Sequence, residues 1–130
     1  DSENRSAPIQ LALVLASHED QRKLQRALDV AQPLAAEHPK SGAAQATLGW
    51  VMLRLGKPEE ANPLLRSVAT ADDADAESLY YLGRFLQSQE SFDEAKAVAL
   101  VVSERTATPG IMAMRPAIRA WVQKTLNVEQ

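Results

Sequence analysis

The chain has 130 residues, which is the usual length of one domain. It contains 22 Ala but only 5 Gly, and this composition favours helices because Ala loses no side-chain entropy in a helix. A net charge of −3 argues against a nucleic-acid binder. The absence of Cys excludes disulfides, thiolate nucleophiles and cysteine zinc sites.

No stretch approaches 18 consecutive apolar residues, so we expect a soluble chain without membrane insertion, whose compartment stays open. The chain begins at Asp1 rather than Met, which favours a processed product or a part of a larger protein. Residues 1–7 are predicted to be a flexible segment ahead of the first helix.

The sequence repeats itself at a shift of 34 residues. Three sets of positions coincide at this shift: Ala27 with Ala61 and Ala95, Val14 with Leu48 and Leu82, and Leu34 with Val68 and Val102. The copies cover about residues 8–41, 42–75 and 76–109, and a fourth half-copy begins at Gly110.

Each copy predicts two helices. The third copy shows this most clearly, because its apolar residues recur twice at helical spacing: Leu79, Leu82, Phe85 and Leu86, then Phe92, Ala95, Val98, Ala99 and Val102. Turn residues at 39–42, 72–75 and 108–110 separate one helix pair from the next. A seventh helix, over about 111–127, is predicted to cover the end of the array, with Arg115, Arg119, Gln123 and Lys124 facing water.

Several residues mark the expected helix ends. Gly56 suits the end of one helix and Pro58 the first turn of the next. Ser91 and Glu94 have the spacing of a capping box, in which each side chain bonds a free backbone N–H. Pro33 and Pro63 fall inside predicted helices, where a proline removes a hydrogen bond, so we expect local bends there.

The period and the motif resemble those of the tetratricopeptide (TPR) repeat, whose pattern is W-x-x-L-G-x-x-Y, then A-x-x-x-F, then P. The second copy carries Leu48-Gly49 and Ala61, the third carries Leu82-Gly83 and Ala95, and the first has Leu15 where Gly is usual. The resemblance covers about residues 8–109. It implies an all-α fold, a right-handed α-solenoid of three TPR hairpins plus a C-terminal capping helix, forming one domain over residues 8–130.

Small residues have a physical role in such a hairpin. Gly49 with Ala61, and Gly83 with Ala95, would let the two helices of a hairpin approach closely. One hairpin cannot bury its apolar face alone, so stacking of at least three is expected to form a continuous core.

The resemblance also implies a concave groove that holds a peptide or a partner helix. The implied groove positions are Ala12, Ala16 and Glu19 in the first copy, Ala46, Trp50, Leu53 and Arg54 in the second, and Glu77, Tyr80, Tyr81, Arg84 and Gln87 in the third. One branch of the family grips a C-terminal carboxylate with Lys, Asn and Arg, but the matching positions here are Ala12, Ala16, Thr47, Glu77 and Tyr81. That clamp is therefore missing.

The groove residues proposed to bind a partner are the aromatic, basic and apolar ones: Trp50, Leu53, Arg54, Tyr80, Tyr81 and Arg84. Trp, Tyr and Arg most often carry binding energy at interfaces. Two interpretations of Trp50 stay open, contact with a partner in the groove or packing against the tyrosines of the next hairpin. Trp121 is predicted to be a core residue or to bury the end of the solenoid.

The sequence predicts no catalytic or metal site and no cofactor. His18 and His38 lack metal-ligand spacing. Asp72, Asp73 and Asp75 resemble the start of a calcium loop but lack its Gly and distal Glu, so helix capping is the preferred interpretation.

Two functions are compatible with these features. The first is a protein–protein interaction module, part of a larger protein and not an enzyme, that binds a peptide or partner helix in its groove. The alternative is a structural spacer or self-association domain that uses the solenoid ends, supported by Met112, Met114, Ile118, Trp121 and Val122 in the last helix.

Overall fold

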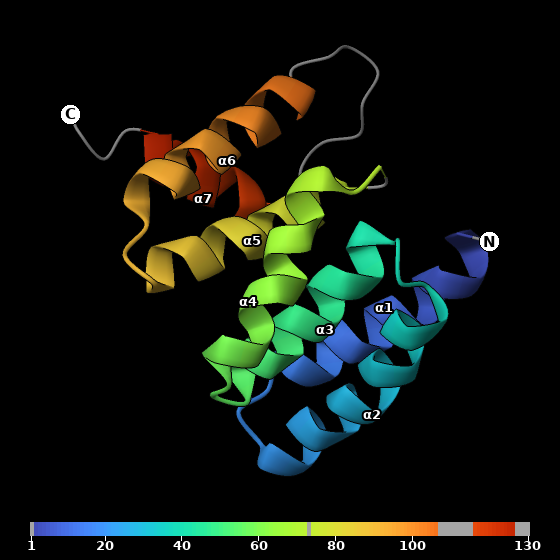
Figure 1. The fold of residues 1–130 in the computed structure, drawn as a ribbon. Coiled ribbons are helices and arrows are strands. Elements are labelled where there is room, and N and C mark those ends of the chain that lie inside the picture. The colour runs from blue at the N-terminus through green and yellow to red at the C-terminus, as the bar shows by residue number, and fades with distance from the viewer. Residues whose placement is uncertain (1, 73, 107–115, 127–130) are drawn as a thin grey trace. The chain divides into compact units, whose positions relative to one another are not determined.

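The computed structural model describes residues 2–72, 74–106 and 116–126 (Figure 1). Within these ranges the chain is all-α, as predicted, and no strand occurs. The described elements are α1 (Ser2–Ala16), α2 (Gln21–Glu37), α3 (Gly42–Arg54), α4 (Pro58–Arg66), the 3-10 helix η1 (Ser67–Thr70), α5 (Ala76–Ser88), α6 (Phe92–Thr106) and α7 (Pro116–Leu126).

The chain divides into two compact units, Asp1–Ala74 and Asp75–Gln130. The boundary falls between the second and the third predicted copies, beside the Asp-rich turn. Each unit is described by itself.

In the first unit, α1 packs against α2, α3 packs against α4, and α3 also contacts α1 and α2. The core forms around α3, which is buried over most of its length, and α2 packs on it with one apolar face. On α2 the buried residues recur every three or four positions: Leu24, Ala27, Leu28, Ala31, Leu34 and Ala35. Val51, Leu65 and Val68 are fully buried.

In the second unit, α5 packs against α6, and α7 contacts both helices. Phe85 and Leu86 of α5 are almost completely buried, and Val102 of α6 and Ile118 of α7 are buried with them. A seventh helix after the third hairpin was predicted over about 111–127. The structure describes it over Pro116–Leu126, and the rest of the predicted range lies outside the described residues.

The turns after α3 and α5 have the same backbone geometry, 34 residues apart. Gly56 has a φ of 79° and Glu90 a φ of 61°, so both lie in the left-handed region. The next amide in each turn, that of Lys57 or Ser91, donates to a carbonyl five residues earlier, at 2.9 and 2.8 Å. This bond is the mark of a Schellman motif, which satisfies a free carbonyl at a helix end.

Other predicted helix ends are also confirmed. Pro58 lies in the first turn of α4. Ser41 and Asp75 cap α3 and α5, because their side chains accept bonds from the amides of Ala44 (3.2 Å) and Ser78 (2.8 Å). Capping is therefore the observed role of Asp75 in the acidic turn.

The start of α1 and the prolines inside α2 and α4 bear on two predictions. Residues 1–7 were predicted to be flexible, but α1 begins at Ser2. A helix already fixed by the packing of its buried residues extends at little cost, so the absence of an apolar pattern there was no signal of a break. Pro33 and Pro63 lie inside α2 and α4 without ending either helix, and the expected bends stay a prediction.

Gly49 and Gly83 face different partners. A Cβ at Gly49 would lie 2.7 Å from Cγ of Leu65 on α4, so this glycine lets the two helices of its hairpin approach, as predicted. A Cβ at Gly83 would instead overlap the indole ring of Trp121 on α7. The close approach of α5 and α6 at Gly83 and Ala95 stays a prediction, and the observed neighbour of Gly83 is the large ring on α7.

Candidate functional site

The proposed partner-binding residues lie in both units, so each set is described within its own unit. In the first unit, Trp50, Leu53 and Arg54 project from α3 and are half-buried. Arg54 closes the end of α1, since its Nε donates to the Ala16 carbonyl at 2.9 Å and its Nη2 to the His18 carbonyl at 3.4 Å. Arg54 thus has a structural role between α1 and α3 that the sequence did not indicate.

Three small residues at implied groove positions are part of the core. Ala12, Ala16 and Ala46 have at most 1% of their surface exposed. They let α1 and α3 pack closely and offer almost no surface to a partner.

In the second unit, Tyr80, Tyr81 and Arg84 project from α5. Both tyrosines are buried, and their ring centroids lie 5.4 Å apart. Arg84 is exposed, and its Nη1 donates to the Tyr80 hydroxyl at 2.7 Å. The guanidinium carbon also lies 5.6 Å from the centre of the Tyr80 ring, which is cation–π distance. Arg84 is therefore held against Tyr80, one turn earlier on the same helix face.

A cleft of about 400 Å³ lies between α5 and α7. Its lining residues are Tyr80, Arg84 and Gln87 from α5, and Ala117, Ala120, Trp121, Lys124 and Thr125 from α7. Below we call it the α5–α7 cleft. Its volume is in the range of about 300–1,000 Å³ that is typical of ligand sites.

Trp121 forms the floor of this cleft and fixes α7 on α5. It is 8% exposed, which confirms the prediction of a core residue. Its Nε1 donates to Oε1 of Gln87 at 2.7 Å, and Nε2 of Gln87 donates to Oγ1 of Thr125 at 3.1 Å. The indole also meets the Tyr80 ring edge-on, with centroids 5.5 Å apart. These contacts join α7 to α5 beside the cleft.

Of the lining residues, Tyr80 and Arg84 were predicted to bind a partner, and Gln87 was an implied groove position. Sequence analysis missed Lys124, which was expected only to face water, and Thr125. The spacing of Trp121, Lys124 and Thr125 at three and four residues places them on one helix face, and this was the available signal. Which neighbour that face meets depends on the packing of α7.

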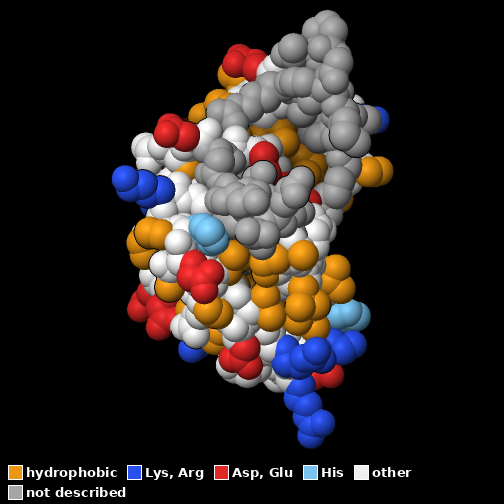
Figure 2. All heavy atoms as spheres, turned by 90° about the vertical axis from the view of Figure 1, so that its right-hand side faces the viewer, with side chains coloured by type: hydrophobic (Ala, Val, Ile, Leu, Met, Phe, Trp, Pro, Cys, Tyr) orange, Lys and Arg blue, Asp and Glu red, His pale blue; other side chains and the backbone are white. Residues whose placement is uncertain are grey.

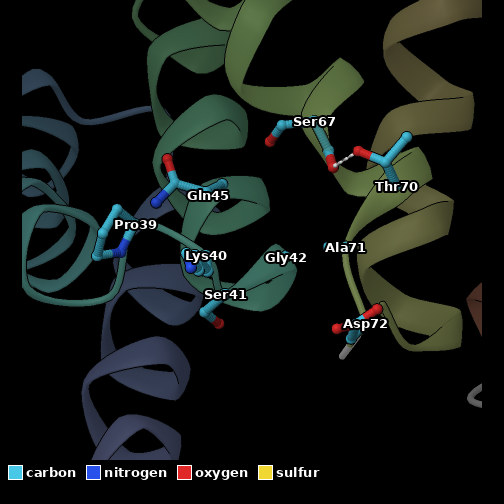
Figure 3. Close-up of a pocket in the computed structure, with 9 residues that line it drawn as sticks. All are labelled: Pro39, Lys40, Ser41, Gly42, Gln45, Ser67, Thr70, Ala71 and Asp72. Atoms are coloured by element: carbon cyan, nitrogen blue, oxygen red, sulfur yellow. Dashed lines mark hydrogen bonds between the residues drawn. The ribbon is translucent and has the colours of Figure 1, made fainter.

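A second cleft, of about 280 Å³, lies in the first unit beside the start of α3 (Figure 3). Its polar groups are used locally. Nε2 of Gln45 donates to the carbonyls of Ala35 and His38, and Oγ1 of Thr70 donates to the Ser67 carbonyl. Lys40 and Asp72 give its lining both charges. This arrangement favours no particular ligand.

The first unit also exposes an apolar face on α1. Leu11 is 48% and Val14 57% exposed, whereas the residues that match Val14 in the other copies, Leu48 and Leu82, are at most 9% exposed. In Figure 2, hydrophobic side chains gather over part of the first unit, and Lys and Arg side chains lie beside them. The same repeat position is therefore core in two copies and surface in the first.

The end of the chain offers less exposed apolar surface than the self-association hypothesis assumed. Ile118, Trp121 and Val122 are buried, so they form no apolar face on the outside of α7. Met112 and Met114 lie outside the described residues.

Across the described ranges, no group of three or more His, Asp or Glu side chains is placed to hold a metal ion. None of the described helices combines the length and the hydrophobicity that a membrane crossing requires. A scan against known protein families finds no family model that matches the chain. A search of curated proteins likewise finds no match.

Proposed function

We propose that the chain is a TPR-like helical repeat module that binds a peptide or a partner helix, as part of a larger protein. The proposal assigns a binding role and no enzymatic activity. Two observations support a repeat architecture: the 34-residue sequence period and the recurrence of the same Schellman turn at Gly56 and Glu90. In this proposal the hairpins stack as a right-handed solenoid, and α7 caps its end.

The α5–α7 cleft is the observation that carries the binding role. It combines the apolar ring of Trp121 with polar side chains, which is the general composition of a ligand-binding pocket and supports a binding role. Three implied groove positions contribute to the cleft, Tyr80, Arg84 and Gln87. For Trp50, Leu53, Tyr81 and Arg54, contact with a partner stays a prediction, and Arg54 is already used to hold the end of α1.

A random dodecamer library displayed on phage tests this function. The unmodified chain is immobilised for the selection. Fluorescence is then measured with the Trp50→Phe variant, in which Trp121 is the only tryptophan and its emission reports on the cleft. We expect selected peptides to shift the Trp121 emission and to bind about tenfold more weakly when Ala120→Tyr fills the cleft. Ala97→Tyr is the matched control, because Ala97 is exposed on α6 and does not line the cleft.

The function is contradicted if no peptide is enriched over a blank surface. It is also contradicted if selected peptides bind the Ala120→Tyr and Ala97→Tyr variants equally well, because the site would then lie elsewhere. Circular dichroism of each variant confirms that the helices are intact.

The alternative function, self-association, is favoured by one observation, the exposed Leu11 and Val14 of α1. In this hypothesis two copies associate through that face, which corresponds to a buried position in the other repeats. Sedimentation equilibrium should then show a dimer that Val14→Gln converts to a monomer, while Leu100→Gln, at an exposed site on α6, does not. A monomer at every accessible concentration removes the hypothesis.

A further inference from the structure

The charge around the α5–α7 cleft differs from that of the chain as a whole. The chain has 17 acidic and 14 basic residues. Among the described residues that line the cleft, however, the charged ones are Arg84 and Lys124, and none is Asp or Glu. The two cations come from different helices, so both walls of the cleft present positive charge. An anionic group entering the cleft is attracted from both sides.

The polar side chains that line the α5–α7 cleft also favour a ligand that accepts hydrogen bonds. Gln87 is engaged through both ends of its amide, since Oε1 accepts from Trp121 and Nε2 donates to Thr125. Arg84 and Lys124 carry only N–H donors. The charged groups at the edge of the cleft therefore match a hydrogen-bond acceptor with negative charge, such as a carboxylate.

Contacts with Tyr80 position Arg84 in the structure without a ligand. Its bond to the Tyr80 hydroxyl and its position over the Tyr80 ring hold the guanidinium, and Tyr80 is itself buried against Trp121. Ordering a long side chain in advance lowers the entropy lost on binding. A guanidinium also presents N–H groups in a planar fork that matches a carboxylate.

From this arrangement we propose that the α5–α7 cleft binds an acidic peptide segment, with an Asp or Glu carboxylate between Arg84 and Lys124. An adjacent apolar side chain packs on Trp121, beside the small residues Ala117 and Ala120. The inference rests on the proposed function and specifies its ligand. A protein segment is a better match than a nucleic acid, because the net charge of −3 opposes a polyanion over the rest of the surface.

The same dodecamer library tests this inference. Selection on the unmodified chain should enrich peptides rich in Asp and Glu, and the enriched peptides should lose about tenfold in affinity when their acidic residues become Asn and Gln. Arg84→Gln and Lys124→Gln should each weaken binding about threefold, and raised salt should reduce the difference. Arg119→Gln is the control, since Arg119 is exposed on α7 but does not line the cleft.

Three outcomes separate the two proposals. Acid-rich peptides that lose affinity with Lys124→Gln but not with Arg119→Gln support both. Peptides that shift the Trp121 emission but show no acid enrichment, and bind the Arg84→Gln and Lys124→Gln variants normally, overturn the acidic ligand and leave the binding function. Absence of any enriched peptide overturns both. Because Arg84 bonds Tyr80, Lys124→Gln is the variant that tests charge without disturbing an observed contact.

Discussion

The α3–α4 hairpin of the first unit and the α5–α6 hairpin of the second share a turn but differ in what their first helix contacts. Both turns place a residue at positive φ and close with a bond across the helix end. Gly49 of α3, however, gives space to Leu65 within its own hairpin, whereas the matching Gly83 of α5 gives space to Trp121 of α7, outside its hairpin. The same small residue serves two different interfaces.

The residues around these glycines differ accordingly. At the 34-residue shift, Leu53 of α3 matches Gln87 of α5, and Arg54 matches Ser88. Gln87 bonds the indole that lies against Gly83, while Arg54 ties α3 to the end of α1. The repeat thus sets the positions of the turns and of the small residues. Differences at single positions, such as Leu53 against Gln87, determine which neighbouring element each helix contacts. In the second unit, Gln87 lines the α5–α7 cleft together with residues of α7.

Trp121→Ala should have the largest effect, because it removes the side chain that joins α7 to α5. Loss of a buried Trp lowers the free energy of unfolding by about 3–5 kcal/mol, and here it also removes the partner of Gln87. Urea unfolding followed by circular dichroism measures the change. Leu100→Ala, at a site that is 51% exposed, is the control. A loss below about 1 kcal/mol would mean that α7 is not held by this contact.

The glycine comparison can be tested directly with Gly83→Ala and Gly49→Ala. Each gains about 1 kcal/mol of helix propensity, so the difference between them reports on packing alone. We expect Gly83→Ala to cost about 1–3 kcal/mol more, because a rigid indole cannot turn away as a leucine side chain can. Urea unfolding of both variants measures this difference.

A double-mutant cycle identifies the partner of each glycine. Trp121→Leu should reduce the cost of Gly83→Ala and leave that of Gly49→Ala unchanged, because only Gly83 lies against the indole. Equal coupling to both glycines would contradict the assigned contacts.

The local features of the fold could be predicted from the sequence, and the contacts between distant elements could not. Gly56 predicts the end of one helix and Pro58 the start of the next, and the 34-residue period predicts the order of the helices. Glu90 gave no signal of positive φ, because Glu rarely adopts it. The partner of Gly83 depends on how α7 rotates about its axis, which no local pattern encodes.

Only the α5 side of the candidate site could be predicted, because the α7 side depends on contacts between distant elements. Tyr80 and Arg84 lie four residues apart on α5, so their shared face followed from helix geometry. Lys124 reaches the cleft because Trp121 of the same helix packs on Gly83, and no sequence pattern indicated that contact.

Arg54→Ala should break a contact that only the first unit has. It removes the donors to the carbonyls of Ala16 and His18, and we expect a loss of about 1–2 kcal/mol. The matching residue of the second unit, Ser88, bonds the Phe85 carbonyl in its own helix, so Ser88→Ala should cost less. Urea unfolding gives both values, and hydrogen exchange at the end of α1 locates the effect. Equal losses of unfolding free energy for Arg54→Ala and Ser88→Ala would contradict the role of Arg54 in joining α3 to α1.

The shared turn gives the smallest expected effect and the most closely matched pair of variants. Glu90→Gly should stabilise the chain by about 0.5 kcal/mol, because Gly adopts positive φ without the Cβ penalty. Gly56→Ala should destabilise it by about 1 kcal/mol for the same reason, with no steric contribution, since nothing lies within 4 Å of a Cβ there. Thermal and urea unfolding measure both changes.

The Glu90→Gly variant both relieves backbone strain and removes a carboxylate. Glu90→Ala separates these two effects. Ala keeps the Cβ that causes the strain, so this variant should leave the unfolding free energy close to that of the parent. A gain with Glu90→Ala equal to that with Glu90→Gly would assign the effect to the charge. Opposite signs for Glu90→Gly and Gly56→Ala, with no gain from Glu90→Ala, would establish that the two units have one turn geometry and that only the first has the residue suited to it.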